Sequence, residues 1–399
     1  MDNQHYVIIG GGVAAVNAAK AIRDHDELAE ISIYGEESSL PYNRVKLSKA
    51  LFTDLHSDKI LIKKEKWFAS QRIHVYSGIK VTAIHAAEST IETVNGQIVA
   101  YDKLLLCTGA HNRKLVLDGA SLRNVHNIRF RQDADSLKAK LQKDDRICIV
   151  GGGIQGVETA WSFLQAGYAV TILEASQRLM PRQLDEKASA ILTRRVIEQG
   201  TQVCLGQGVK RIIGTEHVEG VELQDGAVIP CEHVVYSIGI VPNTELARQT
   251  GLDIGHGILV NAQMETSSAN IYAAGDVAEF HNKVDGLWES AMEQGKIAGM
   301  NMAGVSAAYQ RPISVTLSNS YECPLFSIGL VDEQECDTSL TRENQVSYTR
   351  MFIQNGSICG VIGFGDALAS LPFKAAITQG LSPDELELTK ILDDKENSR

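Results

Sequence analysis

The sequence predicts an α/β protein with two domains of the same design and a smaller α+β domain towards the C-terminus. The main observation is a segment that occurs twice: VIIGGGVAAVNAAKAI begins at Val7, and CIVGGGIQGVETAWSFL begins at Cys148. Each copy consists of an apolar strand-like run, three glycines and a helix-like run rich in small residues. A β-rich segment follows each copy, with a hairpin turn predicted at Asn-Gly 95–96 in the first and at Asp-Gly 225–226 in the second. Further strand-like runs from about Val305 predict the smaller domain.

The glycines stand where a pyrophosphate can meet the first turn of a helix, whose unpaired N–H groups and positive dipole end attract anions. Three positions in each copy need a small residue: one for the tight turn, one for the approach of the phosphate, and one for close packing of helix on strand. They are Gly10, Gly12 and Ala15 in the first copy and Gly151, Gly153 and Gly156 in the second. Two ordinary strand–turn–helix units are the alternative, but the duplication favours two Rossmann-like dinucleotide-binding domains.

An acidic residue ends the second apolar strand of each copy, Glu36 in ISIYGEES and Glu174 in AVTILEAS. A carboxylate at this distance from the glycines can accept hydrogen bonds from a ribose diol. Glu174 favours NADH over NADPH, because a 2′-phosphate would meet a negative charge. Arg178 and Arg182 lie close by in the sequence and leave some use of NADPH open.

Length and composition limit the function classes. A chain of 399 residues suggests two or three domains, and a net charge of −11 argues against general affinity for nucleic acid or anionic membranes. No apolar run is long enough to span a bilayer and the first strand begins too soon after Met1 for a signal peptide, so a cytoplasmic location is expected. The seven cysteines and eleven histidines show no spacing typical of a redox disulfide or a metal site, so neither is predicted.

The glycine loops belong to a series of motifs that continues along the chain with LPYNRVKLSK, YDKLLLCTGA, RLMPRQLD, SIGIVPNTEL, IYAAGDVAE and WESAMEQG. In this order, up to about Gly304, the series resembles the FAD-dependent pyridine nucleotide-disulfide reductase superfamily. Within it the chain is most similar to the ferredoxin and rubredoxin reductase branch, which includes NADH:rubredoxin reductases and the flavin portion of NADH-dependent nitrite reductases. The last hundred residues resemble the C-terminal domain of this branch more loosely.

The resemblance assigns the first glycine loop to FAD and the second to NAD. It implies a discontinuous FAD-binding domain over residues 1–112 and 244–304, with an NAD-binding domain over 113–243 inserted between the two parts. Residues 305–399 would then form a C-terminal interface domain. The expected fold is therefore α/β, with two Rossmann-like domains, for FAD and NAD, plus a smaller α+β C-terminal domain.

The resemblance also implies roles for single residues. Lys49 and Glu158 resemble the catalytic ion pair that this branch places beside N5 of the flavin; the alternatives are a solvated lysine and a helix-surface glutamate. Asp276, in the AAGD turn, is expected to bind the ribityl chain of FAD; the alternative, an N-cap of the next helix, is compatible with that role. Arg44 would neutralise the FAD pyrophosphate, with a surface salt bridge as the alternative. The other residues expected to contact a cofactor are Val13, Ala14, Glu37, Val81, Thr108, Gly109, Gln155, Arg182, Gly239, Gly275, Trp288 and Gln294.

The cysteines decide which second half-reaction is expected. Glutathione-type reductases carry a CxxxxC pair, and the NADH oxidase, peroxidase and coenzyme A disulfide branch carries one cysteine in the PY loop, where this chain has Asn43. Hydride from NADH would therefore reach the flavin and pass on as electrons to a small acidic redox protein, such as rubredoxin or ferredoxin. Basic residues that could form a docking patch, or simply a solvated helix face, are Arg44, Lys46, Lys49, Lys59, Lys63, Lys64 and Lys66. A peroxide-producing NADH oxidase and a redox-sensing flavoprotein are the alternatives, and the identity of the acceptor and the oligomeric state stay open.

Overall fold

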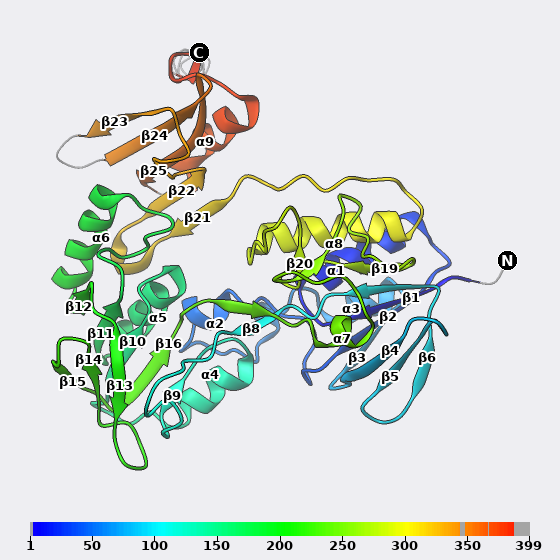
Figure 1. Cartoon of the computed structure of the whole chain (residues 1–399), viewed down its shortest axis with the longest axis horizontal. Helices are drawn as coiled ribbons and strands as arrows, with labels where there is room; N and C mark the ends of the chain where they lie inside the picture. The colour runs from blue at the N-terminus through cyan, green and yellow to red at the C-terminus, as the bar shows by residue number, and fades with distance from the viewer. Residues whose placement is uncertain (1–2, 344–347, 366, 387–399) are drawn as a thin grey trace. The chain divides into compact units, whose positions relative to one another are not determined.

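The computed structural model describes residues 3–343, 348–365 and 367–386 (Figure 1). The chain divides into two compact units. The first contains Met1–Lys46, Asp54–Arg113 and Gly239–Pro312, and the second contains Leu47–Thr53, Lys114–Ile238 and Ile313–Arg399. The three domains expected from the sequence have different boundaries and stay a prediction.

The first unit is built on a five-stranded parallel sheet with the strand order β19-β7-β1-β2-β3. The strands are β1 (His5–Ile9), β2 (Glu30–Gly35), β3 (Ile73–Ser77), β7 (Lys103–Leu106) and β19 (Ile271–Ala273). Every neighbouring pair is parallel, and the central strands are buried on both faces, as an all-parallel sheet covered on both sides requires.

Two long helices, α1 (Val13–His25) and α8 (Trp288–Met302), pack side by side in this unit (Figure 1). Glycines on α8 allow the close approach. A Cβ on Gly295 would lie 2.2 Å from the carbonyl oxygen of Ala14, and one on Gly299 would lie 2.4 Å from that of Ala18. The small residues of both helices are therefore explained by helix packing, which holds the N-terminus of α1 against the rest of the unit.

Smaller elements complete the first unit. A three-stranded antiparallel sheet contains β4 (Val81–His85), β5 (Thr90–Thr93) and β6 (Ile98–Ala100), with the predicted turn at 95–96 between the last two. β8 (Ala110–Asn112) pairs with β17 (Ile240–Pro242), and β18 (Ile258–Leu259) pairs with β20 (Ala278–Glu279). The short helices are η1 (Asp58–Ile60), α3 (Glu65–Ser70) and α7 (Glu245–Gln249), while α2 (Lys46–Lys49) spans the boundary between the units.

The second unit repeats the design with a parallel sheet of order β12-β11-β10-β16-β9. The strands are β9 (Val125–His126), β10 (Arg146–Val150), β11 (Ala169–Glu174), β12 (Gln202–Leu205) and β16 (His233–Tyr236). Its helices are α4 (Arg131–Lys138), α5 (Ile154–Gln165) and α6 (Glu186–Glu198). A three-stranded sheet of β13 (Val209–Ile213), β14 (Gly220–Leu223) and β15 (Val228–Pro230) contains the predicted turn at 225–226.

The C-terminal part of the second unit is an antiparallel sheet of order β21-β22-β25-β24-β23 with a helix packed on it. These elements are β21 (Val315–Ser318), η2 (Ser320–Glu322), β22 (Leu325–Gly329), β23 (Thr338–Glu343), β24 (Tyr348–Gln354), β25 (Ser357–Phe364) and α9 (Ala367–Gln379). Phe326 on the sheet and Phe373 on the helix meet in its core, with ring centroids 5.6 Å apart. The predicted α/β fold with a smaller α+β part is thus confirmed.

The segment LSPDELELTKIL predicts a helix start with Ser382 as N-cap and Glu385 completing a capping box. This box is present: the N–H of Glu385 donates to the hydroxyl oxygen of Ser382 at 3.3 Å, and the N–H of Ser382 donates to Glu385 Oε2 at 2.8 Å. The sequence of the last residues, DDKENSR from Asp393 onward, predicts disorder, and these residues lie outside the described ones. Among the helices of the described residues, none has both the length and the hydrophobicity that crossing a membrane requires.

Candidate functional site

The first glycine loop joins β1 to α1. Gly10 has a φ of +116°, and a Cβ there would lie 2.0 Å from the carbonyl oxygen of Cys107, so no other residue fits. Gly12, which precedes α1, is different, because a Cβ at this position would meet nothing within 4 Å. The fold therefore requires Gly10. Gly12 is not required by the fold, but the absence of a side chain there leaves space in front of the N-terminus of α1.

The second loop, between β10 and α5, repeats this division of roles. Gly151 has a φ of +111°, and a Cβ there would lie 2.3 Å from the carbonyl oxygen of Ser237. A Cβ on Gly156 would lie 1.9 Å from the carbonyl oxygen of Gly151, so helix and turn pack closely, as the sequence predicts. A Cβ on Gly153 meets nothing within 4 Å. Both helix N-termini thus offer N–H groups and room for a phosphate, which fits the pyrophosphate of a dinucleotide.

The acids near the first loop are paired with basic or hydroxyl groups. Glu36 is exposed and its Oε1 accepts a hydrogen bond from Lys80 Nζ at 2.9 Å. Glu37 accepts hydrogen bonds from the hydroxyl of Tyr42 at 2.6 Å and from Arg44 Nη2 at 2.5 Å. Arg44 is therefore balanced by a carboxylate in this structure, and its role at the pyrophosphate stays a proposal.

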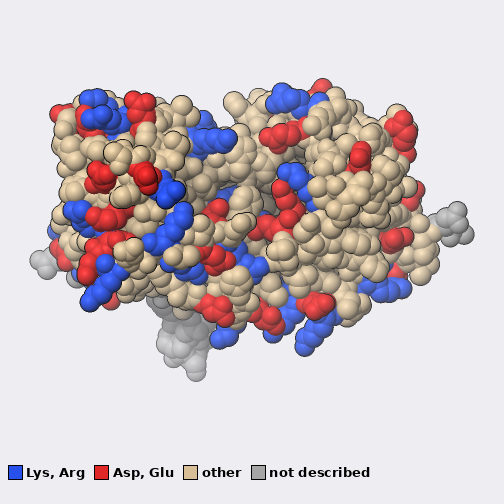
Figure 2. All heavy atoms as spheres, turned by 90° about the horizontal axis from the view of Figure 1, so that it is seen from below, with Lys and Arg blue, Asp and Glu red and all other residues tan. Residues whose placement is uncertain are grey.

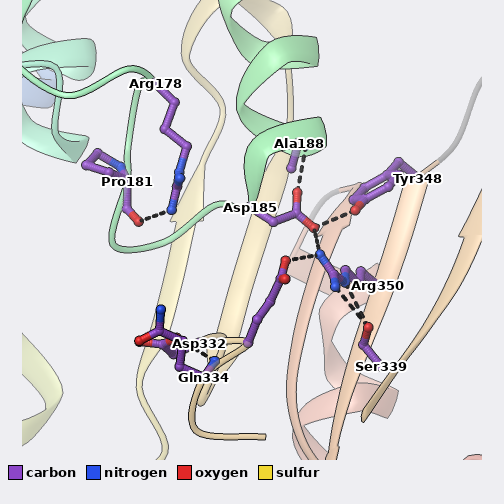
Figure 3. A network of polar contacts seen from close by, with 10 residues as sticks. Arg178, Pro181, Asp185, Ala188, Asp332, Gln334, Ser339, Tyr348 and Arg350 are labelled. Atoms are coloured by element: carbon purple, nitrogen blue, oxygen red, sulfur yellow. Dashed lines mark hydrogen bonds and ion pairs between the residues drawn. The ribbon is translucent and has the colours of Figure 1, made fainter. Parts of the chain in front are cut away.

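Glu174, the last residue of β11, is held by one backbone N–H of the second glycine loop and one of the loop that follows β11. Its Oε2 accepts from the N–H of Gly152 at 2.6 Å, and its Oε1 accepts from the N–H of Ser176 at 2.7 Å. Each carboxylate oxygen keeps further acceptor capacity, so the group is oriented without being saturated. Arg178 and Arg182 are exposed, and Arg178 donates to the carbonyl oxygen of Pro181 at 3.3 Å (Figure 3).

Lys49 and Glu158 lie together in the second unit, with Nζ 3.1 Å from Oε1. The glutamate side chain is only 6% exposed, whereas that of the lysine is 43% exposed. Burial raises the pKa of Glu158 above its usual value, and the ammonium of Lys49 opposes this shift. The hydroxyl of Ser162 on α5 donates to the carbonyl oxygen of Ser48 at 2.7 Å and holds the two segments together. Sequence motifs predicted this ion pair between two distant segments; its position beside a flavin stays a proposal.

The AAGD turn lies against the N-terminal part of α1. Gly275 has a φ of +84°, and a Cβ there would lie 3.1 Å from the Cβ of Ala14. The N–H of Gly275 donates to Oε1 of Gln294 at 2.8 Å, and Gln294 is buried in α8. The turn that carries Asp276 is thereby fixed close to the first glycine loop, in the first unit. The expected helix capping by Asp276 is wrong, because β20 follows this turn and the next helix, α8, has Leu287 as its N-cap.

The other predicted cofactor residues have local structural roles. Thr108 donates through its hydroxyl to the carbonyl oxygen of Asn243 at 2.8 Å, and the N–H of Asn243 donates to the carbonyl oxygen of Gly109 at 2.9 Å. In the second unit, Gln155 bridges the loop after β16, because its Oε1 accepts from the hydroxyl of Ser237 at 3.2 Å. The remaining residues are Val13 and Val81, which are buried, Gly239, with a φ of +101°, and Trp288, which is partly buried at the start of α8.

The basic residues of the first unit are partly balanced by nearby groups. Lys64 pairs with Asp58 at 3.4 Å, and Lys63 Nζ lies 5.2 Å from the centroid of the Trp67 ring. Lys46 donates to the carbonyl oxygen of Lys59 at 2.7 Å. On the face drawn in Figure 2, lysine and arginine side chains are interspersed with aspartate and glutamate side chains.

Two groups of titratable side chains lie together in the structure without a signal in the sequence. Cys336 and Cys359 are 23 residues apart, yet their sulfur atoms lie 3.4 Å from each other. His126, His233 and Asp145 form a chain, with contacts of 3.2 Å between the two rings and 3.0 Å from His233 to the carboxylate. Neither group has a characteristic spacing, because strand pairing brings the residues together, and only knowledge of the register could have revealed them.

Known proteins match nearly the whole chain. Residues 4–295 match the family model described as pyridine nucleotide-disulphide oxidoreductase, and residues 315–381 match the rubredoxin NAD+ reductase C-terminal domain. Rhodocoxin reductase from Rhodococcus erythropolis is 33% identical over 81% of this chain and 78% of its own length. The nitrite reductase [NAD(P)H] of Bacillus subtilis is 31% identical over 92% of this chain, which covers only 46% of that protein.

A crystal structure of a ferredoxin reductase for the CYP199A2 system from Rhodopseudomonas palustris superimposes with a TM-score of 0.89, at 26% identity, covering 96% of this chain and 97% of the other. The chain thus spans about half the length of the first curated relatives and nearly the full length of this solved reductase. The match of the first family model covers well over half of the chain. The chain therefore belongs to the pyridine nucleotide-disulphide oxidoreductase family.

Proposed function

We propose that the chain is an FAD-dependent NADH oxidoreductase that passes electrons to a small redox protein of the rubredoxin or ferredoxin type. The observation that carries the proposal is the pair of glycine loops, each with open space in front of a long helix at Gly12 and Gly153. Two such loops in one chain suit two dinucleotides, and the relatives named as reductases support the direction of the reaction.

The residues around each loop fit the two dinucleotides. In the first unit, the N-terminus of α1, Glu36 or Glu37 and the turn with Asp276 would hold the phosphates, ribose and ribityl chain of FAD. In the second unit, the N-terminus of α5 and Glu174 would hold NADH. Bound FAD supplies the chemistry that the side chains lack, since it accepts a hydride and releases electrons one at a time.

The Lys49–Glu158 pair would position the reacting rings and adjust the local charge. The buried carboxylate lies 3.1 Å from the ammonium, and the lysine side chain is partly exposed at the surface of the second unit. Such a preorganised charge stabilises a transition state without reorganisation during the reaction. We therefore assign a positioning role to Glu158 and a cofactor-contacting role to Lys49.

The cysteines near the first loop do not suit a thiol relay. Cys107 is buried, and burial raises the pKa of its thiol well above the usual value, which disfavours the nucleophilic thiolate. Asn43 occupies the position at which other members of the superfamily have a reactive cysteine. Direct electron transfer from the flavin to an external acceptor needs no such thiol.

The basic residues between Arg44 and Lys66 would favour an acidic acceptor protein, because complementary charge accelerates encounter. We expect the double substitution Lys63→Glu with Lys64→Glu to slow acceptor-protein reduction about tenfold at low salt and to weaken its salt dependence. The rate of NADH oxidation with a small dye acceptor should stay unchanged, since a small molecule needs no docking surface.

Steady-state assays with NADH and each acceptor test this proposal. The matched control is Lys140→Glu with Lys143→Glu, which changes the net charge equally at two exposed lysines of the second unit. Equal loss of activity in both double variants, or equal loss with protein and dye acceptors, would contradict a docking role for Lys63 and Lys64.

A further inference from the structure

The C-terminal sheet brings two thiols into contact. Cys336 lies in the turn between β22 and β23, Cys359 lies on β25, and their Sγ atoms are 3.4 Å apart. Both side chains are partly exposed. Neither cysteine takes part in the proposed function.

Backbone pairing explains why the two cysteines meet. At the end of β22, Gly329 pairs with Gly360, and the N–H of Leu330 donates to the carbonyl oxygen of Cys359 at 2.9 Å. A Cβ on Gly360 would lie 1.8 Å from the carbonyl oxygen of Leu330, so a glycine is required next to Cys359. The turn is thereby held against β25 directly beside the thiol.

The turn is also fixed on the far side of Cys336. The side chain of Gln354 donates to the carbonyl oxygen of Glu335 at 2.7 Å, and the N–H of Asp337 donates to the carbonyl oxygen of Ile353 at 2.9 Å. Both neighbours of Cys336 are therefore bonded to β24. The thiol contact results from an ordered turn, because hydrogen bonds fix the chain on both sides of it.

Figure 3 shows a further attachment of the same turn. Arg350 on β24 contacts Glu333 of the turn and also Asp185, which caps α6, with Nη1 3.1 Å from Asp185 Oδ2. The hydroxyl of Tyr348 donates to the same carboxylate oxygen of Asp185. The turn that carries Cys336 is thus part of a polar network that extends to α6 within the second unit.

We propose that Cys336 and Cys359 are a site of reversible disulfide formation, with a low-molecular-weight disulfide such as glutathione disulfide as the oxidant. A disulfide bond is about 2.05 Å long, so the two sulfur atoms must approach by roughly 1.3 Å. Cys336 stands in a turn outside the regular strands, where a side-chain rotation and a small backbone shift can supply this movement.

The reaction is two thiol–disulfide exchanges. One cysteine loses its proton, its thiolate attacks a sulfur of the small disulfide, and a mixed disulfide forms as one small thiol leaves. The second cysteine then attacks the protein sulfur of that mixed disulfide and releases the second small thiol. In the net reaction two protein thiols are oxidised to one disulfide, and one small disulfide is reduced to two small thiols.

The surroundings of Cys336 make this exchange slow at neutral pH. Burial, the thiol of Cys359 and the acidic side chains of Asp332 and Glu335 raise the pKa of Cys336 to about 12. The thiolate fraction of Cys336, and with it the exchange rate, is expected to increase as the pH rises towards this raised pKa. The pair would therefore respond to sustained rather than brief exposure to small disulfides.

The experiment uses the full chain, first reduced and then incubated at defined ratios of glutathione to glutathione disulfide. Remaining thiols are blocked with N-ethylmaleimide, and the protein is digested with trypsin without reductant. Trypsin cleaves after Arg342 and Arg350, so peptides with Cys336 and Cys359 stay joined only through a disulfide. We expect this joined peptide, lighter by two hydrogen atoms than the sum of its parts, and its separation on addition of reductant.

Variants assign the cross-link. Cys336→Ser and Cys359→Ser should each abolish the joined peptide, whereas Cys204→Ser, which removes another partly exposed thiol, should leave its yield unchanged. A second control needs no substitution: wild-type chain whose thiols are blocked with N-ethylmaleimide before oxidation should give no joined peptide. This control stays available if a variant fails to fold. Three results would overturn the proposal. The cysteines could form mixed disulfides with glutathione and no cross-link, they could stay reduced at every ratio, or the cross-link could survive in Cys336→Ser.

Discussion

At the residue scale, the glycine loops separate the needs of folding from those of binding. Gly10 and Gly151 are required by the chain itself, since a Cβ at either would collide with a carbonyl oxygen at 2.0 or 2.3 Å. Gly12 and Gly153 face open space, so the fold gives no reason for glycine there. A phosphate group that approaches the helix N-terminus would give that reason.

The substitutions Gly12→Ala and Gly153→Ala test this separation. We expect the stability of the cofactor-free protein to change by less than about 0.5 kcal/mol, because each new methyl group enters open space. Gly12→Ala should weaken FAD binding, and Gly153→Ala should weaken NADH binding, each at least about tenfold, or roughly 1.4 kcal/mol. Urea unfolding and titration calorimetry measure the two quantities.

The matched control is Gly208→Ala, where a Cβ would make an ordinary contact of 3.4 Å with the side chain of Gln224. This variant should bind both dinucleotides as the wild type does. Unchanged affinities in Gly12→Ala and Gly153→Ala would show that the open space in front of the helices is not where phosphates bind.

The Lys49–Glu158 pair makes a second prediction at this scale. In Lys49→Met the buried carboxylate of Glu158 loses its counter-charge, and its already raised pKa should rise further. A raised carboxylate pKa means that the folded state holds the proton more tightly than the unfolded state. Protonation of Glu158 therefore stabilises the folded state fully below the unfolded pKa, near 4.5. This contribution is lost as the pH rises from there through the raised pKa of the folded state.

We expect Lys49→Met to lose about 1 kcal/mol of unfolding free energy at pH 7, a modest value because the lysine is partly exposed, and Glu158→Gln in the same chain to recover most of it. Flavin reduction by NADH should slow about tenfold in each single variant, Lys49→Met and Glu158→Gln, because each loses one member of the charged pair. Urea unfolding and stopped-flow absorbance measure the two effects. If the double variant were no more stable than Lys49→Met, the energetic coupling of the pair would be contradicted.

Motifs revealed this pair in the sequence, but they did not reveal the partners of Arg44 or the contact between Cys336 and Cys359. Arg44 binds Glu37 and Tyr42 through side-chain geometry that neighbouring sequence letters do not specify. The cysteine contact depends on strand register and on a hydrogen-bonded turn. Local patterns thus predict which residue types a site needs, whereas long-range pairing decides which side chains meet.

At the scale of elements, the pairing of β9 with β16 stacks two histidines. The rings of His126 and His233 are 5.4 Å apart, and both residues are buried. Burial lowers the pKa of His126 to about 3, with further lowering by the charges of His233 and Lys140. Burial also lowers the pKa of His233, although Asp145 opposes this shift.

The stability of the second unit should therefore fall on acidification. Below pH 6.5 a histidine in the unfolded chain becomes protonated, whereas folded His126 stays neutral. The stability that is present above this pH is therefore lost as pH falls. Between pH 7.5 and 5.5, His126 alone accounts for about 1.4 kcal/mol. Urea unfolding at both pH values measures the loss, and His126→Gln should show a loss smaller by that amount. An identical loss in the variant would rule out the contribution of His126.

The order of the elements was largely predictable, because each strand–turn–helix unit has its own apolar run and glycine turn. Both hairpin turns were also found from Asn-Gly and Asp-Gly. Short strands were not predicted: β8 pairs with β17 over a distance of more than a hundred residues, and neither has an amphipathic pattern of its own. Such pairing is determined by the surrounding fold rather than by strand propensity.

At the scale of the whole molecule, we propose that the preference for one nicotinamide dinucleotide depends on Glu174. Its carboxylate is held by two backbone N–H groups, at 2.6 and 2.7 Å, and would face a 2′-phosphate with like charge. We expect kcat/KM for NADH to exceed that for NADPH at least tenfold, or roughly 1.4 kcal/mol. Steady-state kinetics with both dinucleotides decide this, and equal or better use of NADPH would contradict it.

The central claim is that the chain transfers electrons from NADH through bound FAD to a small redox protein, without a thiol relay. The most direct measurement is anaerobic stopped flow with two mixing steps. NADH is first mixed with the FAD-loaded protein, and oxidised rubredoxin or ferredoxin is then added. The absorbance of the flavin and the reduction of the acceptor protein are followed after each step. We expect rapid loss of flavin absorbance with NADH, and rapid recovery on mixing with the acceptor protein. Flavin absorbance that recovers only when air is admitted would contradict it and would favour an oxidase or a redox sensor.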